Sequence, residues 1–319
     1  MKTDRTGCTA ISCVVCWFML LVVGTAFAAP RAAKELPGEV TISQDIKIGA
    51  AIYLTLTLEN GTPVVVLLDT GSAVTHLDES LVPYLGPKKG TTEVIFPAMG
   101  WITAALYNQP KLFLNGTELK AEGKVQVYPF RLRPSSGTEI RGILGLNCLK
   151  HYCLQIDPEA GKLRFLKSGH FQKSEAGRYY SMVISQDYEI AAVEGNLLGD
   201  EDTGSIVDTG WSTDGALQQK NFRKALRRKG ARLIRQGDPV TCNPPSAALL
   251  PVASFHMSSY TNVVINDARQ ADIYGLRFLA RHVATLDFPD ERLYLRRIDD
   301  SITVSGNGKA GIVEATRNP

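Results

Sequence analysis

A three-residue motif, Asp-Thr-Gly, follows two apolar segments of this 319-residue chain, and its duplication constrains the fold more than any other feature. The first copy lies in Leu67–Ser72 and the second in Ile206–Trp211, with the two aspartates, Asp69 and Asp208, 139 positions apart. Short apolar runs of this kind predict buried strands. Each copy therefore places a carboxylate at the end of a strand.

A second signature follows each motif and shows that the whole segment is repeated. Gly145–Phe165 aligns without a gap on Gly275–Leu295. Four matched pairs differ by 130 in number: Gly145/Gly275, Leu149/Leu279, Asp157/Asp287 and Leu163/Leu293. The repeat is too long for a solenoid unit of about 20–50 residues, so a duplicated small domain fits better.

A third Asp-Thr-Gly, at Asp202, is not expected to supply a catalytic aspartate. It follows Gly199-Asp200-Glu201, which is typical of a charged turn rather than of a buried strand. A reactive carboxylate needs rigid support, and only Asp208 has an apolar pair directly before it. Asp208 is therefore the predicted partner of Asp69.

These motifs resemble those of the aspartic peptidases, in particular the retropepsin-like and pepsin-like families. The resemblance rests on both copies of apolar-apolar-Asp-Thr-Gly, each followed by an apolar-apolar-Gly segment, Ile143–Gly145 or Ile273–Gly275, and it covers about Leu36 to Arg297. It implies an all-β fold of two similar retropepsin-like β-barrel lobes, bilobal as in pepsin-like proteins. The active cleft would lie between the lobes, and helices would be few and short.

The resemblance also implies the site residues. Asp69 and Asp208 would be catalytic, because two carboxylates brought face to face share one proton and so supply an acid and a base at one place. Their supporting residues would be Thr70, Gly71, Ser72, Thr209 and Gly210. The threonines would bond across the lobes, the glycines would allow close approach to the carboxylates, and the Ser72 hydroxyl would donate to Asp69.

One position departs from this pattern. Trp211 stands where Ser72 stands in the first copy, and its indole offers no hydroxyl. Either Ser212 or Thr213 replaces the missing donor, or the pair is asymmetric.

A hairpin that covers the substrate is expected between Asp69 and Ile143. The candidate is Phe96–Ile102, with Gly100 at its tip and Trp101 as an apolar lid. The alternative places Trp101 in the ordinary core. The second half has only Cys242–Ser246 at the corresponding place.

The chain is expected to divide into five parts. Residues 1–28 read as a signal peptide, with a charged start, an apolar run and an Ala-Phe-Ala cleavage box. Residues 29–37 are a leader, 38–170 the N-terminal lobe, 171–300 the C-terminal lobe and 301–319 a disordered tail. This predicts export to the periplasm or outside the cell, with an uncleaved membrane anchor as the alternative.

Strands are expected at high density. They are predicted at Val40–Leu58, Thr62–Leu68, Leu112–Leu114, Leu119–Val127, Tyr179–Ile184, Glu189–Val193, Ser205–Val207, Val252–Met257 and Asn262–Ile265. Turns are expected at Glu59–Gly61 and at Asn115-Gly116. Short helices are predicted at Leu146–His151 and Leu276–His282, and one longer helix with a basic, solvated face at Gln218–Arg235.

Composition excludes several other classes. A net charge of +3 gives no case for nucleic-acid binding, and the five histidines show no metal-ligand spacing, so no metal or cofactor is expected. Three cysteines follow the signal: Cys148, Cys153 and Cys242. They form no disulfide framework; Cys148 reads as a small core residue, and a Cys148–Cys153 bridge stays open.

The sequence therefore predicts a monomeric aspartic endopeptidase that acts on a peptide or protein substrate, with no membrane partner once the signal is removed. The alternative is a catalytically silent, exported peptide-binding protein on the same fold.

Overall fold

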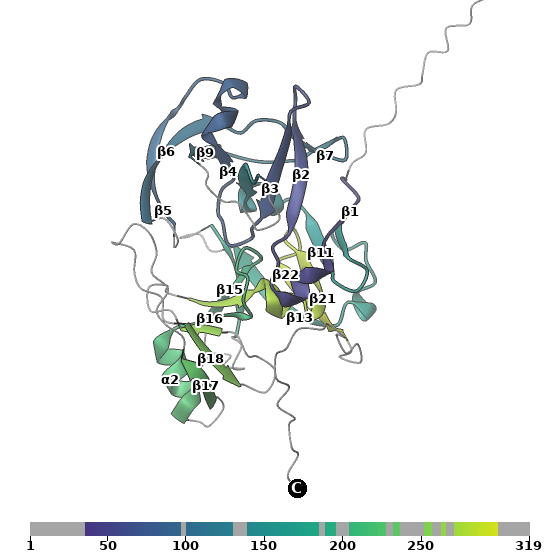
Figure 1. The fold of residues 1–319 in the computed structure, drawn as a ribbon. Helices are drawn as coiled ribbons and strands as arrows, with labels where there is room; N and C mark the ends of the chain where they lie inside the picture. Colours follow the sequence, from purple (N-terminus) through teal and green to yellow (C-terminus); the bar gives the residue numbers. More distant parts are fainter. Residues whose placement is uncertain are drawn as a thin grey trace, which may run out of the picture. The chain divides into compact units, whose positions relative to one another are not determined.

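The computed structural model describes residues 36–96, 100–129, 139–184, 189–195, 204–227, 232–236, 252–256, 263–265 and 271–298. In these ranges the chain is mostly β, with two large sheets and a few short helices (Figure 1). The all-β prediction is confirmed. The predicted signal peptide, the C-terminal tail, Asp202 and Cys242 lie outside the described residues.

The first sheet belongs to the first repeat. Its strand order is β5-β6-β9-β4-β10-β3-β2-β7-β8. The strands are β2 (Tyr53–Leu58), β3 (Pro63–Leu68), β4 (His76–Asp78), β5 (Gly90–Phe96), β6 (Gly100–Asn108), β7 (Leu112–Leu114), β8 (Thr117–Glu118), β9 (Lys124–Tyr128) and β10 (Gly142–Leu144). The alternating buried residues of β2 and β3 supply much of its core.

Two predicted strands of this half are interrupted. Strands β2 and β3 meet at the predicted Asn60-Gly61 turn, where the Leu58 N–H donates to the Thr62 carbonyl oxygen. The expected strand Val40–Leu58, however, divides into β1 (Glu39–Thr41), the 3₁₀ helix η1 (Gln44–Ile48) and β2. Ser43 accepts a bond from the Asp45 N–H at the start of η1, and Gly49 ends the helix at φ 96°. This capping overrides the strand pattern.

The second correction concerns Leu119–Val127. The Asn115-Gly116 turn joins β7 to the two-residue strand β8, and both turn residues have positive φ, as a tight hairpin requires. The residues that follow leave this hairpin, and β9 pairs instead with β4 and β6.

The second sheet contains strands from both repeats. Its order is β1-β12-β11-β21-β22-β13-β14-β15-β20-β16-β19-β18-β17. After β1, the strands are β11 (Cys153–Asp157), β12 (Lys162–Leu166), β13 (Arg178–Ile184), β14 (Ala191–Glu194), β15 (Gly204–Asp208), β16 (Gly215–Leu217), β17 (Arg232–Gln236), β18 (Val252–His256), β19 (Val263–Ile265), β20 (Asp272–Gly275), β21 (His282–Asp287) and β22 (Arg292–Arg297).

The repeats meet where β11 pairs with its own equivalent, β21. The pairing is antiparallel and centred on Gln155 opposite Thr285, two residues that are 130 positions apart. The Gln155 side-chain amide donates to the Thr285 hydroxyl over 3.1 Å. Leu154 faces the equivalent of Ile156, and Ile156 faces the equivalent of Leu154, so the pairing is symmetric about Gln155 and Thr285. The halves are therefore joined as the subunits of a twofold dimer are.

Helices are short within the described ranges. Each repeat has one at the predicted place, α1 (Leu146–Leu149) and α3 (Leu276–Leu279), and the others are α2 (Gln219–Arg227), η2 (Glu79–Tyr84) and η3 (Lys173–Glu175). The long helix predicted at Gln218–Arg235 is wrong, because α2 ends at Arg227 and β17 begins at Arg232. Pairing with β18 outweighs helix propensity in that segment. No described helix is long and apolar enough to cross a membrane.

Cys148 and Cys153 are both buried and free, so they form no bridge. Burial raises the pKa of the Cys148 thiol to about 12, which leaves it protonated at neutral pH. The interpretation of Cys148 as a small core residue agrees with its full burial.

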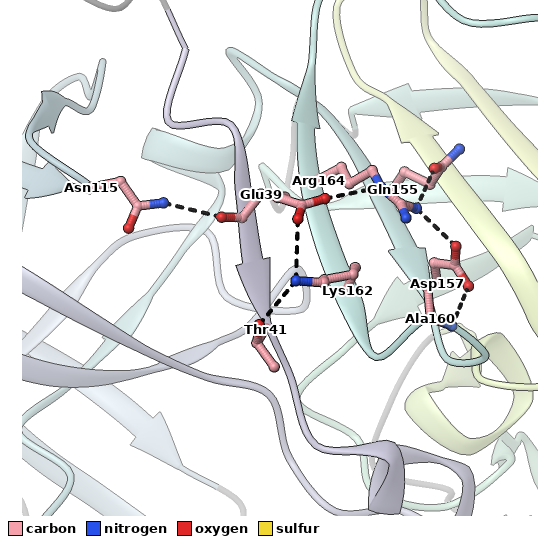
Figure 2. A network of polar contacts seen from close by, with 8 residues as sticks. All are labelled: Glu39, Thr41, Asn115, Gln155, Asp157, Ala160, Lys162 and Arg164. Atoms are coloured by element: carbon pink, nitrogen blue, oxygen red, sulfur yellow. Dashed lines mark hydrogen bonds and ion pairs between the residues drawn. The ribbon is translucent and has the colours of Figure 1, made fainter.

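A polar network fastens β1 to β12 and β11 (Figure 2). Lys162 Nζ lies 3.1 Å from a Glu39 carboxylate oxygen. The Arg164 guanidinium donates to Asp157 over 2.8 Å and to the Gln155 side-chain oxygen over 3.0 Å, and it reaches Glu39 at 3.6 Å. Arg164 therefore links three neighbouring strands of the sheet.

Asp157 makes part of this network depend on pH. Burial alone would raise the pKa of Asp157, but bonds from the Ala160 N–H and the Arg164 guanidinium outweigh burial and lower the pKa below its ordinary value. A carboxyl whose pKa is lowered by folding stabilises the fold above its unfolded pKa, and this contribution is lost as the pH falls through the folded value.

We predict that Asp157→Asn lowers the free energy of unfolding by about 1 kcal/mol at pH 7 and by much less near pH 3, since only the charged bond to Arg164 is lost. Denaturant melts at both pH values measure the difference. Asp290→Asn is the control, because its exposed pair with Lys173 contributes little, and it should leave the midpoint unchanged. An equal loss at both pH values would contradict the prediction.

Candidate active site

The two Asp-Thr-Gly motifs occupy equivalent places in the fold. Asp69 directly follows β3, and Asp208 is the last residue of β15. A parallel strand lies beside each: β10 beside β3 and β20 beside β15. The residues just before the aspartates, Leu68 and Val207, are fully buried. Each carboxylate therefore stands at the end of a rigid, buried strand.

A glycine at or directly after the end of each supporting strand lets the motif loop pack closely. A Cβ atom at Gly145 would lie 2.3 Å from the Val74 carbonyl oxygen, and one at Gly275 would lie 2.3 Å from the Thr213 carbonyl oxygen. These distances are far below van der Waals contact, so only glycine fits. The Leu146 N–H donates to Ser72 O in the first half. The motif loop of the first half is therefore bonded directly to the residue that follows its apolar-apolar-Gly segment.

Thr70 and Thr209 cross-link the two loops in a symmetric pattern. The Thr70 hydroxyl donates to Val207 O over 2.7 Å and accepts from the Thr209 N–H over 3.1 Å. The Thr209 hydroxyl donates to Leu68 O over 2.9 Å and accepts from the Thr70 N–H over 3.0 Å. Both threonines are almost fully buried. The four bonds hold the ends of β3 and β15 together.

Each aspartate lies against the glycine of the other motif. A Cβ atom at Gly71 would lie 2.3 Å from Asp208 Cγ, and one at Gly210 would lie 2.6 Å from Asp69 Cγ. Each glycine N–H also donates to the aspartate of its own motif, Gly71 to Asp69 over 2.8 Å and Gly210 to Asp208 over 2.9 Å. The structure thus brings together Asp69, Thr70, Gly71, Asp208, Thr209 and Gly210.

No protein-family model matches this chain, and no curated protein is detectably similar to it. The case for its function therefore rests on the geometry of its own residues.

Two carboxylates held this close to each other's motif can act together as an acid and a base. Asp208 is 5% exposed and Asp69 is half-buried, so both carboxylates are largely shielded from water. Neighbouring carboxylates of this kind titrate as a unit and hold one proton between them over a range of pH. Such a pair can take a proton from water and give one to a leaving group.

The predicted role of Ser72 is wrong. Its hydroxyl proton goes to the Val74 carbonyl oxygen, 2.9 Å away, rather than to Asp69, and its oxygen lies 3.0 Å from His76 Nε2. A hydroxyl has one proton to donate, and the nearby backbone carbonyl takes it. Ser72 therefore shapes the motif loop and does not bond directly to the carboxylate.

The side chains that follow Asp208 make different hydrogen bonds from those that follow Asp69. The half-buried Trp211 donates through Nε1 to the Thr213 hydroxyl over 2.8 Å, and that hydroxyl donates to Gly215 O. Ser212 is exposed. Thr213 therefore does not replace the missing hydroxyl beside Asp208, because its proton is used locally.

The hairpin proposed as a substrate cover exists as β5 and β6, which run antiparallel over seven residue pairs (Figure 1). Trp101 is 67% exposed, so the alternative that places it in the core is wrong. Gly100 is the first residue of β6 and pairs with Phe96, while the tip at residues 97–99 lies outside the described residues.

Two residues near Asp69 escaped sequence analysis. His76 is 4% exposed, and its ring contacts that of Tyr128 edge-on at 5.6 Å. Burial and, to a smaller extent, the charge of Asp69 raise the pKa of Tyr128. The position of His76 seven residues after Asp69 was the one available signal, and Tyr128 had none. In the described ranges, no cluster of His, Cys, Asp and Glu could hold a metal ion.

We predict that Thr70→Val and Thr209→Val each lower the free energy of unfolding by about 2–4 kcal/mol. Each change removes two cross-links and leaves a backbone N–H and a carbonyl buried without a partner. Denaturant melts measure the loss. Thr55→Val is the matched control, because Thr55 is exposed in β2, and it should change stability by less than about 0.5 kcal/mol. If Thr70→Val and Thr209→Val lost no more stability than Thr55→Val, the cross-links between the two loops would not contribute to the stability of the fold.

Proposed function

We propose that this chain is an aspartic endopeptidase that hydrolyses peptide bonds with a water activated between Asp69 and Asp208. The observation that carries the proposal is the reciprocal approach of each carboxylate to the glycine of the other motif. The cross-linked threonines support it, since they fix the spacing of the two loops.

The proposed reaction needs only these two side chains and water. The ionised carboxylate takes a proton from the water, whose oxygen attacks the carbonyl carbon, while the protonated carboxyl donates to the carbonyl oxygen. The C–N bond of the tetrahedral intermediate then breaks as the nitrogen receives the proton that the first carboxyl took. One hydroxyl of the intermediate returns its proton to the second carboxylate as the carbonyl re-forms. The products are an acid and an amine, and the pair returns to its starting state with one shared proton.

A silent peptide-binding protein is the second candidate, and one observation favours it. Neither Ser72 nor Thr213 gives its hydroxyl proton to an aspartate. Neither of these two residues therefore serves as the outer hydroxyl that the aspartic-peptidase resemblance implies. On this reading the fold would bind extended peptides without cleaving them.

One experiment separates the candidates. Purified protein is incubated with a mixed peptide library from pH 3 to pH 8, with and without a statine-type inhibitor, and products are identified by mass spectrometry. A peptidase gives new termini that the inhibitor suppresses. Peptides retained by the protein but left intact at every pH would instead support the silent binder. The predicted exported location is a separate proposal, tested by fractionating cells and sequencing the N-terminus of the protein.

A further inference from the structure

The surroundings of Asp69 contain a hydrogen-bonded pair with no counterpart in the second motif. His76 Nε2 lies 3.0 Å from Ser72 Oγ, in the loop that carries Asp69. The residue equivalent to His76 in the second half is Ala216, which pairs with Ile273 as His76 pairs with Ile143. The half of the site built by the first repeat is thus the one supported by an ionisable ring.

The direction of this bond follows from the donors available. Ser72 gives its single proton to Val74 O, so at its oxygen it can only accept from His76. His76 Nε2 therefore carries a proton, and the ring is the neutral Nε2–H tautomer. The bond holds Ser72, whose N–H and carbonyl are tied to Asp69 O and the Leu146 N–H respectively.

The packing around the ring fixes its orientation. His76 lies in β4 between β9 and β10, opposite Gln126 and Ile143 in register. Its ring contacts that of Tyr128 edge-on at 5.6 Å, and the charge of Asp69 is, after burial, the second cause of the raised pKa of Tyr128. The ring therefore lies buried against the Tyr128 ring.

We propose that His76 is a positioning residue of the Asp69 half of the site: its neutral ring holds the motif loop through Ser72, and its protonation sets the lower pH limit of activity. The inference rests on the proposed peptidase function. A second proton would put a buried positive charge beside Tyr128 and Ser72, in the half of the site that carries Asp69.

Among the residues that the structure describes, the ionisable and charged groups on the elements packed around β4 include Tyr128 on β9, Asp69 after β3, Asp78 on β4 itself and Arg141 before β10. Asp78 accepts from the Ser80 N–H, and the Arg141 guanidinium donates to the Ser80 hydroxyl, so both point toward η2.

Burial lowers the pKa of His76 to about 4 from its ordinary value of 6.5. The unfolded chain therefore binds the proton at higher pH than the folded one does. Stability contributed by the neutral ring is complete above pH 6.5 and falls as the pH drops from there toward 4. Activity in the folded protein should fail near the lower of these values.

Three variants test the proposal on the full chain. His76→Gln keeps a donor for Ser72 without a titrating ring, His76→Phe keeps the ring contact with Tyr128 without a donor, and His170→Gln changes an exposed histidine as the control. We measure kcat and KM of peptide cleavage from pH 3 to pH 8.

We expect His76→Phe to lower kcat at least tenfold at pH 7 with little change in KM. His76→Gln, which keeps a donor for Ser72, should retain most of the kcat of the parent at that pH. We also expect the acid limb of kcat to move at least half a pH unit lower in His76→Gln and not in His170→Gln. An unmoved acid limb, or a Phe variant with the kcat of the parent, would overturn the inference while leaving the peptidase intact.

Nuclear magnetic resonance of ring-labelled histidine gives a second reading that does not depend on cleavage. The resonances absent from His76→Gln identify the His76 ring, which should remain the Nε2–H tautomer from pH 8 to about pH 5. A Nδ1–H tautomer, or titration near pH 6.5, would sink the inference even in an active protein. A parent that cleaves no peptide would sink the proposed function, and the role of His76 in the reaction with it.

Discussion

Asparagine at position 69 or 208 should lower kcat for peptide cleavage more than a hundredfold in each case. Asparagine keeps the size of the side chain and an oxygen that can accept from the Gly71 or Gly210 N–H, so the loops should stay in place. It cannot take or give a proton, however, and proton transfer by a positioned group contributes about 10²–10⁴ in rate.

The two single losses should not add. If Asp69 and Asp208 act as one unit, Asp69→Asn/Asp208→Asn should be no slower than the poorer single variant within a few-fold. Steady-state kinetics on one peptide substrate measure all three, and far-ultraviolet circular dichroism checks the fold.

Asp202→Asn is the matched control, since Asp202 carries the same Asp-Thr-Gly-Ser letters as Asp69 but follows a charged turn. It should cleave at the rate of the parent. Retained activity in Asp208→Asn together with a loss in Asp202→Asn would transfer the assignment to the third motif. Retained activity in Asp69→Asn would remove the mechanism altogether.

The two aspartates could be identified from the sequence because the same motif, in the same surroundings, occurs in both halves of the repeat. Asp69 and Asp208 each end an apolar strand and precede an equivalent glycine segment, and the fold places them as this pattern predicts, at the ends of β3 and β15. The threonine cross-links followed from the family resemblance alone. The all-β class followed from the density of strand patterns and turns.

What escaped prediction depends on contacts between residues far apart in the chain. The pairing of β11 with β21 joins the halves, yet neither strand pattern names its partner. The segment Gln218–Arg235 has good helix formers, and only the neighbouring strand β18 shows that its end pairs as β17.

The orientation of the Ser72 hydroxyl and of the His76 ring could not be predicted from the sequence either. Whether the Ser72 hydroxyl donates to Asp69 or to Val74 O depends on the geometry of the loop, which the Asp-Thr-Gly motif does not specify. His76 looked like any lone histidine until its burial beside that loop was known.

Alanine at position 71 should also lower kcat about a hundredfold or more, although it adds a single methyl group. The added Cβ would lie 2.3 Å from Asp208 Cγ and 2.5 Å from its Oδ2, so the carboxylate must move by about 1 Å to restore van der Waals contact. A displacement of that size in a catalytic group can cost about 10²-fold in rate. Overpacking should lower the free energy of unfolding by about 1–3 kcal/mol as well.

The mirror change tests whether the two glycines play the same part. Gly210→Ala places its Cβ 2.6 Å from Asp69 Cγ and should reproduce both the kinetic and the stability loss. Gly86→Ala is the control, because no atom lies within 4 Å of a Cβ built there, and it should match the parent in kcat and in denaturant midpoint. Since the close approach of each glycine to the opposite carboxylate carries the proposed function, Gly71→Ala and Gly210→Ala variants within threefold of the parent in kcat would show that the two carboxylates do not react as a facing pair.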